Sequence, residues 1–263
     1  MLIKSDDATI FYTTMGSGPD LVLLHPSPCN HTFWLPIASQ LALTYRVVLP
    51  DLRGHGQSSP GEGPATMEKH AEDLVRICKE LKIEKAIFAG VSIGGYVLME
   101  FWKRYREMVR AFILADTRGA ADTDDVRSGR QRTVEDVQRH GPQPYLDSML
   151  EPLLGETTRR NRPDIVQAAR ATMQDSTVEG ITAVQQGMAE RPDYVTLLPT
   201  INVPTLLVFG SEDTVTPVSV GRFMQQNIPQ SILRILVNAG HLALMEKPED
   251  ALRVIGSFLD QLQ

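Results

Sequence analysis

Short apolar runs typical of strands alternate with helical patterns over the first 118 residues, and this alternation limits the possible folds more than any other sequence feature. The later runs are apolar at almost every position, as strands covered on both faces are. Strands separated by helices build a parallel sheet with right-handed connections. The runs interpreted as strands are Ile10–Met15, Leu21–Leu24, Arg46–Leu49, Ala86–Val91 and Ala111–Ala115.

Two helices are predicted between these strands. Apolar residues from Met67 to Leu81 recur at the spacing of one helix face, and Thr66 precedes them as a candidate N-cap. This helix would cover one face of the sheet. A second helix is expected to begin near Ile93 and to run through Trp102.

The pattern changes after the fifth strand. Residues 119–199 contain no convincing strand, whereas strand-like runs return at Thr205–Phe209 and Ile232–Val237, before an amphipathic helix around Ala251–Leu262. At about 150 residues per domain, the length fits one domain that carries an insertion. We therefore predict an α/β core of residues 1–118 and 200–263 and a helical cap at 119–199. The expected cap helices are Asp125–Arg139, Pro144–Leu154, Pro163–Met173 and Val178–Glu190.

The composition excludes several classes of protein. The 26 basic and 32 acidic residues give a net charge of −6, which argues against nucleic acid and anionic membranes as partners. Cys29 and Cys78 cannot form a disulfide framework and are expected to be buried free thiols. The first residues lack the apolar stretch of a signal peptide, and the most apolar uncharged window, Ala86–Met99, is shorter than a membrane span. We expect a cytoplasmic protein.

The sharpest local motif is Gly90-Val91-Ser92-Ile93-Gly94, between a predicted strand and a predicted helix. This is the G-x-S-x-G pattern of a nucleophile elbow, in which a strained turn presents the serine hydroxyl at the edge of a sheet. Residues two before and two after the serine crowd that turn and must be small, as Gly90 and Gly94 are. The alternative is that Ser92 occupies an ordinary strand-to-helix turn. We favour Ser92 as a nucleophile.

A serine nucleophile needs a base, and the base needs a partner that orients it. Among six histidines, His241 stands out because it follows the last predicted strand on a loop. Asp213 likewise follows the strand Thr205–Phe209. Asp116, at the end of an earlier strand, is a rival for the acid, although a strand-end residue that bonds the local backbone is the simpler interpretation.

With these motifs in order, the chain resembles the α/β-hydrolase family over nearly its whole length. Within that family it is most similar to serine esterases and 3-oxoadipate enol-lactonases. The resemblance implies an α/β-hydrolase fold, with a mostly parallel eight-stranded sheet flanked by helices and an inserted helical cap. The segments that carry it are Leu23–Pro26, Pro50–Ser58, Gly210–Pro217 and the pair Gly240-His241.

The resemblance also implies roles. Ser92 would attack an acyl carbonyl and form an acyl-enzyme, His241 would move the proton, and Asp213 would orient His241. The backbone N–H groups of Ile93 and Ser27 would form the oxyanion hole. After His25, where relatives carry glycine, this chain has Pro26, and Pro28 follows Ser27. In having proline after the oxyanion residue, this chain resembles the cofactor-free haloperoxidase and perhydrolase branch of the family. The resemblance implies perhydrolysis as a side activity.

The predicted function is therefore hydrolysis of carboxylic esters of small or medium size. A lactonase is the nearest alternative, a carbon–carbon hydrolase lacks a motif of its own, and a haloalkane dehalogenase would need aspartate at Ser92. A ligand receptor of the same fold is the non-enzyme alternative. The motifs of nucleotide and metal sites are absent from the sequence, so no cofactor is expected. The oligomeric state is open.

The candidate substrate pocket comprises Phe33, Trp34, Met149, Met173 and Met188, although such methionines are often part of the core of the cap.

Overall fold

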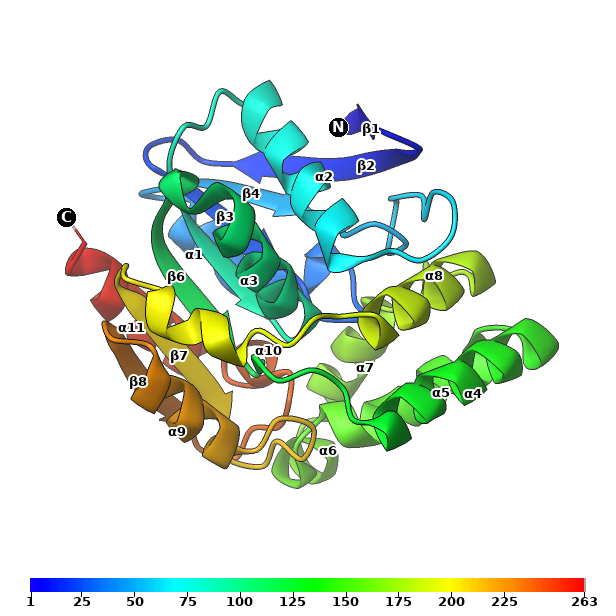
Figure 1. Ribbon diagram of the computed structural model, residues 1–263. Coiled ribbons are helices and arrows are strands. Elements are labelled where there is room, and N and C mark those ends of the chain that lie inside the picture. Colours follow the sequence, from blue (N-terminus) through cyan, green and yellow to red (C-terminus); the bar gives the residue numbers. More distant parts are fainter. Residues whose placement is uncertain (263) are drawn as a thin grey trace.

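The computed structural model describes residues 1–262 and has an eight-stranded sheet at its centre (Figure 1). The strand order is β1-β2-β4-β3-β5-β6-β7-β8. Strand β2 pairs antiparallel with β1 and β4, and all other neighbours are parallel, which confirms the mostly parallel sheet. The strands are β1 Leu2–Ser5, β2 Ala8–Met15, β3 Asp20–Leu24, β4 Arg46–Pro50, β5 Ala86–Val91, β6 Val109–Ala115, β7 Thr205–Gly210 and β8 Ser231–Leu236.

Seven of these strands correspond to the runs predicted from the sequence. The four-residue strand β1 gave no signal because it lies at the edge of the sheet and only Ser5 is buried. The central strands β5 and β7 are buried at every position. This burial on both faces is the physical reason for their unbroken apolar sequences.

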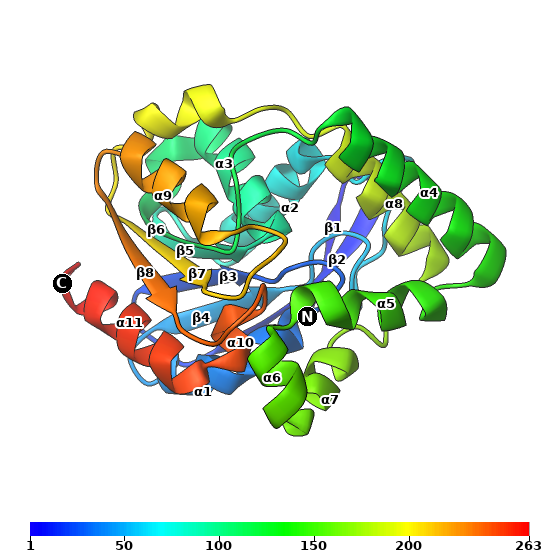
Figure 2. The ribbon, with the colours of Figure 1, turned by 90° about the horizontal axis from the view of Figure 1, so that it is seen from below.

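Helices cover both faces of the sheet (Figure 2). One face carries α2 (Met67–Glu80), α3 (Ile93–Tyr105) and α9 (Val218–Asn227). The other carries α1 (Leu35–Leu41) and α11 (Pro248–Asp260), which pack against each other. Alternate strand residues therefore point into two separate apolar cores, one on each side of the sheet.

The segment between β6 and β7 forms five α-helices, and α4 packs along α8 beyond the end of the sheet (Figure 1). Four match the predicted helices within two residues, and α6 was missed because its six residues are too few to show a period. The division into a core and a cap at residues 119 and 199 stays a prediction. The five helices are α4 Asp124–His140, α5 Gln143–Leu153, α6 Glu156–Asn161, α7 Pro163–Ala171 and α8 Val178–Ala189.

Both cysteines are buried and unpaired, as expected from the sequence. In the part of the chain that the structure describes, every helix is too short or too polar to span a bilayer. The same residues contain no cluster of three or more histidine, cysteine or acidic side chains that could hold a metal ion.

Candidate active site

Ser92 occupies the turn that joins β5 to α3. Its backbone has φ 53° and ψ −114°, a left-handed conformation that is rare for any residue except glycine. Two hydrogen bonds hold this turn: Ser92 N donates to Ala115 O at 3.0 Å, and Thr117 Oγ1 donates to Ser92 O at 2.7 Å. Ser92 is half-buried although both of its chain neighbours are fully buried. The strained turn thus keeps one hydroxyl accessible in a dense core.

The glycines of the motif are required by close backbone contacts. A Cβ at position 90 would lie 2.5 Å from the carbonyl carbon of Gly94, and one at position 94 would lie 2.7 Å from the carbonyl oxygen of Leu24. Both contacts involve backbone atoms, which cannot move aside cheaply. The structure therefore has the crowding that the elbow interpretation predicts.

His241 and Asp213 form a buried pair at the ends of β8 and β7. Nδ1 of His241 lies 2.8 Å from Oδ2 of Asp213. Oδ1 of Asp213 accepts the N–H groups of Val215 and Thr216 at 2.8 and 2.9 Å, and Oδ2 accepts the Thr216 hydroxyl at 2.5 Å. Burial opposes ionisation of Asp213, but the hydrogen bond from His241 and those from Thr216 outweigh it and lower the pKa of the carboxyl. An ionised Asp213 favours a proton on Nδ1 of His241, the ring nitrogen that faces the carboxylate.

Asp116, the rival acid, has a different set of contacts. Its side chain is buried, and Oδ1 accepts the N–H of Gly210 at 2.8 Å. Within residues 1–262, no protein atom donates to Oδ2. Burial, reinforced by the charge of Asp213, raises the pKa of Asp116 well above its usual value. Asp116 therefore ties the end of β6 to the end of β7, whereas Asp213 contacts the histidine.

Ser92 and His241 line one cavity of about 460 Å³, together with Ser27. Helices α4, α5 and α8 form much of its wall, which includes Met149 and Met188; their part in binding a substrate stays a prediction. The wall is therefore apolar in part, but it also contains charged and amide groups. The remaining lining residues are Tyr96, Arg118, Val126, Gly129, Arg130, Thr133, Tyr145, Leu153, Gln185 and Val215.

Three predicted pocket residues lie elsewhere, which corrects that part of the prediction. Phe33 and Trp34 are 2% and 1% exposed, and their rings pack edge to face at 5.2 Å in the core beneath α1. Met173 is buried in the same core and borders a separate hollow between α5 and α7. The two aromatic residues directly precede an amphipathic helix, and this position, rather than their proximity to Ser27, determines where their side chains pack.

The loop that contains Ser27 is held by two buried histidines. Oγ of Ser27 lies 3.0 Å from Nε2 of His55, and Nε2 of His25 accepts the N–H of Leu52 at 2.9 Å. Burial lowers the pKa of His25 to about 4 and that of His55 to about 3, so both rings are neutral near pH 7. In residues 1–262, the backbone N–H groups of Ser27 and Ile93 donate to no other protein atom. They remain available to a ligand.

The segment that follows β4 supports this loop. Asp51 accepts the backbone N–H groups of His31 and Gln57 at 2.7 and 2.9 Å, and its Oδ1 lies 2.8 Å from Nδ1 of His31. Arg53 donates two hydrogen bonds to Asp73, at 2.9 and 2.8 Å. None of Asp51, Arg53 and His55 lines the cavity that contains Ser92. These side chains fix the backbone beside the cavity.

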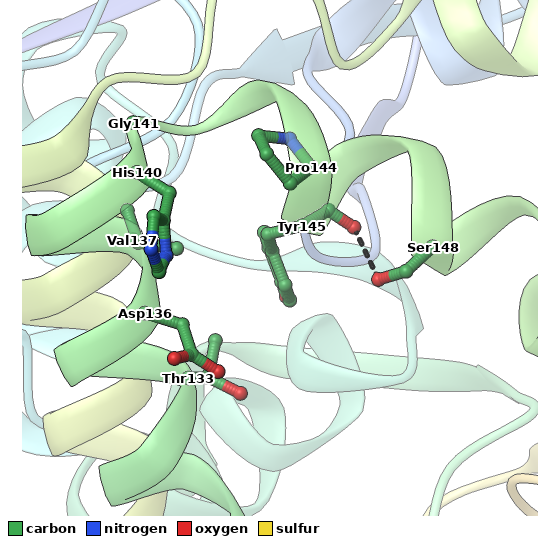
Figure 3. A pocket seen from close by; sticks show the side chains of 8 residues that line it. All are labelled: Thr133, Asp136, Val137, His140, Gly141, Pro144, Tyr145 and Ser148. Carbon is green, nitrogen blue, oxygen red and sulfur yellow. Dashed lines mark hydrogen bonds between the residues drawn. The ribbon is translucent and has the colours of Figure 1, made fainter.

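A further hollow, of about 360 Å³, lies between α4 and α5 (Figure 3). His140 and Asp136 come from α4, and Ser148 comes from α5, where its hydroxyl donates to the carbonyl oxygen of Tyr145 at 2.7 Å. Thr133 and Tyr145 line both this hollow and the cavity with Ser92. The two spaces therefore share a wall, but only one of them contains Ser92 and His241.

Comparisons with known proteins agree on one family. The profile of the family described as alpha/beta hydrolase fold matches residues 19–248. A 3-oxoadipate enol-lactonase from Acinetobacter baylyi is 29% identical over 94% of this chain and 91% of its own length. A thermophilic esterase from Thermogutta terrifontis, solved with malate bound, is 35% identical, covers 100% of this chain and 98% of its own, and has a TM-score of 0.96. The enol-lactonase from Burkholderia xenovorans has the same fold, at 23% identity, coverage of 99% and 100%, and a TM-score of 0.91.

Proposed function

The chain belongs to the α/β-hydrolase family, and on that premise we propose that it is a serine hydrolase that cleaves small or medium carboxylic esters through an acyl-enzyme. The observation that supports this most is one cavity whose wall contains both Ser92 and His241, with His241 paired in turn to Asp213. A half-buried hydroxyl on a strained turn and an oriented imidazole are the two groups that acyl transfer to serine requires.

In the first step, Nε2 of His241 takes the hydroxyl proton as Oγ of Ser92 attacks the carbonyl carbon of the ester. The tetrahedral intermediate then collapses: the bond to the alkoxy oxygen breaks, and His241 gives the proton to the departing alcohol. Water next attacks the acyl-enzyme, with His241 again taking a proton and returning it to Ser92. The products are one acid and one alcohol. Ionised Asp213 stabilises the imidazolium that forms in both steps.

The negative oxygen of each tetrahedral intermediate would accept hydrogen bonds from the backbone N–H groups of Ser27 and Ile93. Both N–H groups lack a protein partner in the described chain. Pro26 and Pro28 flank Ser27, and fixed backbone angles reduce the rearrangement that binding would require. Pro26 thus stands where relatives carry glycine, and the backbone N–H of Ser27 remains as the donor.

Turnover of short p-nitrophenyl esters by the wild-type protein and by Ser92→Ala tests the proposal. We expect repeated turnover and a loss of about 10⁶-fold in kcat in the variant, because the nucleophile and its base act as a unit. Ser257→Ala is the matched control, since Ser257 is exposed on α11. A Ser92→Ala protein with wild-type turnover would contradict the proposal, and a single slow acylation without turnover would favour the ligand receptor.

Lactone hydrolysis is the second candidate, because a relative that matches 94% of the chain is an enol-lactonase. A lactone is a cyclic ester, so the same groups would open it, with the alcohol remaining attached to the acid product. Parallel assays on butyrolactones and on acyclic esters of equal carbon number would rank the two activities. Perhydrolysis stays a prediction, tested by peracetic acid formation from acetate and peroxide beside the Ser92→Ala control.

A further inference from the structure

Three arginines surround one aspartate next to the cavity. Asp122 accepts hydrogen bonds from Arg118 at 3.1 Å, from Arg130 at 2.5 Å and from Arg191 at 2.9 Å. We call these four side chains the arginine cluster. Arginine stays protonated in proteins, and the three guanidinium groups lower the pKa of Asp122 despite its burial. The cluster therefore has three positive charges and one negative charge.

Arg191 has a structural role within the cluster. Its side chain is fully buried, and its guanidinium lies 4.0 Å from the centre of the Tyr96 ring. It also donates to the carbonyl oxygen of Ala120 at 2.6 Å. These contacts join the segment after β6 to the segment after α8. Arg191 and Asp122 thus neutralise each other and leave two further positive charges.

The two remaining arginines, Arg118 and Arg130, both line the cavity that contains Ser92. Among residues 1–262, no aspartate or glutamate lines that cavity. Nε of Arg118 is buried and donates to no protein atom in residues 1–262. A buried donor without a partner costs free energy, and the cost is larger for a charged group. Because Asp122 offsets only one of the three guanidinium charges, Arg118 and Arg130 give the cavity wall a net positive region.

The side chains around this region fix its position. Arg118 directly follows Thr117, whose hydroxyl holds the carbonyl of Ser92. Arg130 donates to Oε1 of Gln185 at 3.0 Å, and Nε2 of Gln185 donates to the Tyr145 hydroxyl at 2.8 Å. The arginines are thereby held at one part of a wall whose other part contains Met149, Leu153, Met188 and Val215.

We infer that the cavity selects substrates that carry a carboxylate in addition to the ester or lactone bond, and that Arg118 and Arg130 bind it. A planar guanidinium offers parallel donors that match a carboxylate, and Asp122 already occupies such a position between the same arginines. The carbon chain between the carboxylate and the ester would pack on the apolar part of the wall. This inference rests on the proposed function of Ser92.

The test compares charged esters with neutral esters of almost equal shape. The first pair is monoethyl adipate and its primary amide, which carry the charge in the acid part. The second pair is 4-acetoxybutanoate and its amide, which carry it in the alcohol part. We expect kcat/KM of the wild-type protein to favour the acid over the amide by about 10- to 100-fold in at least one pair, as hydrogen bonds to a charged group would give.

Arg118→Gln should reduce that acid-to-amide ratio to within about threefold of one, because Asp122 keeps two other arginines while the cavity wall loses one of its two guanidinium groups. Arg118→Lys keeps the charge without the paired donors and should retain part of the ratio; it also serves if the glutamine variant does not fold. The matched control is Arg127→Gln, since Arg127 lies one turn before Arg130 on α4, is exposed and pairs with Asp124. We expect the wild-type ratio in this control.

The outcomes separate the two proposals. Hydrolysis of the amides as fast as the acids by the wild-type protein, or an unchanged ratio in both Arg118 variants, overturns the carboxylate inference and leaves the serine hydrolase standing. Absence of hydrolysis of all four esters and of the p-nitrophenyl esters would instead contradict the proposed function.

Discussion

The sheet edge that holds Ser92 and the helices between β6 and β7 build the same cavity by different means. At the sheet edge, backbone atoms in close contact set the geometry, and Gly90 and Gly94 leave no room for a Cβ. In the helical segment, long charged side chains such as Arg130 and Arg118 meet on Asp122. If the proposed function holds, the first region places the reacting groups and the second faces the substrate. Steric requirements of the backbone are local, whereas pairing of side chains depends on the whole fold.

The largest expected effect separates the two acids at the sheet edge. Asp213→Asn should lower kcat on esters by about 10⁴-fold, because the amide cannot stabilise the imidazolium and favours the wrong tautomer of His241. Asp116→Asn is the matched control, since Asp116 is equally buried but bonds Gly210 instead. We expect it to retain kcat within about tenfold. Equal losses in the two variants would assign Asp116 a role in the reaction.

The second prediction compares a glycine from each region. A Cβ at Gly94 would collide with the backbone of Leu24, and we expect Gly94→Ala to lower the free energy of unfolding by about 3 kcal/mol. At Gly129, on α4, the nearest atom to an added Cβ is the end of Arg132 at 3.7 Å. There, alanine should raise the free energy by about 0.5–1 kcal/mol through helix propensity.

Urea unfolding curves of both variants measure this contrast. A tolerated alanine at position 94 would show that the elbow can relax, and a destabilising alanine at position 129 would show that α4 is as tightly constrained as the sheet edge.

Glu246 joins the two regions and gives the third prediction. Its carboxylate accepts the N–H of Gly155, at the start of α6, at 3.0 Å and that of Gly240, next to His241, at 2.8 Å. Glu246→Gln replaces one acceptor oxygen with a donor, so one N–H loses its partner, at a cost of about 1–3 kcal/mol. We expect a lower melting temperature and a moderate fall in kcat.

The control is Glu249→Gln, because Glu249 is exposed at the start of α11. If Glu246→Gln has the same melting temperature and kcat as this control, the hydrogen bonds of Glu246 do not couple the two regions.

The smallest predicted effect concerns pH. The folded pKa of Asp116 is raised, so the unfolded chain releases its proton first, and this group lowers stability as pH rises above about 4. Asp213 has a lowered pKa and does the opposite: its contribution is full above about 4 and is lost as the pH falls further. Asp116→Asn should therefore be more stable than wild type at pH 8, with a difference that shrinks below pH 4. Thermal melts across pH 3.5–8 check the sign.

The contrast between the two regions also explains which parts of the site and of the fold could be predicted from the sequence. Ser92, Asp213 and His241 each follow an apolar strand, so chain order and strand ends suffice to bring them to one edge. The short helix α6 and the edge strand β1 are too brief to show a period. Phe33 and Trp34 were misplaced because an aromatic pair has the same sequence whether it faces a core or a cavity.

The arginine cluster could not be predicted from the sequence for a different reason. Arg118 and Asp122 are four residues apart, but Arg191 joins them across 69 residues of chain from Asp122. No local pattern predicts which distant arginine meets a given aspartate, or that a donor of Arg118 is left without a partner. The sequence therefore indicates a reaction but no preference for charged substrates.

The close approach of Gly155 and Gly240 has a practical consequence for engineering. A Cβ at Gly155 would lie 2.8 Å from the backbone nitrogen of Gly240, so at this point the helical segment and the histidine loop meet without intervening side chains. A chimera that exchanges α4 to α8 for those of another hydrolase must keep glycine at position 155. A side chain there would collide with the backbone next to His241 and move the ring away from Asp213. Exchange points placed outside this contact would let substrate preference be transplanted while the reacting groups stay aligned.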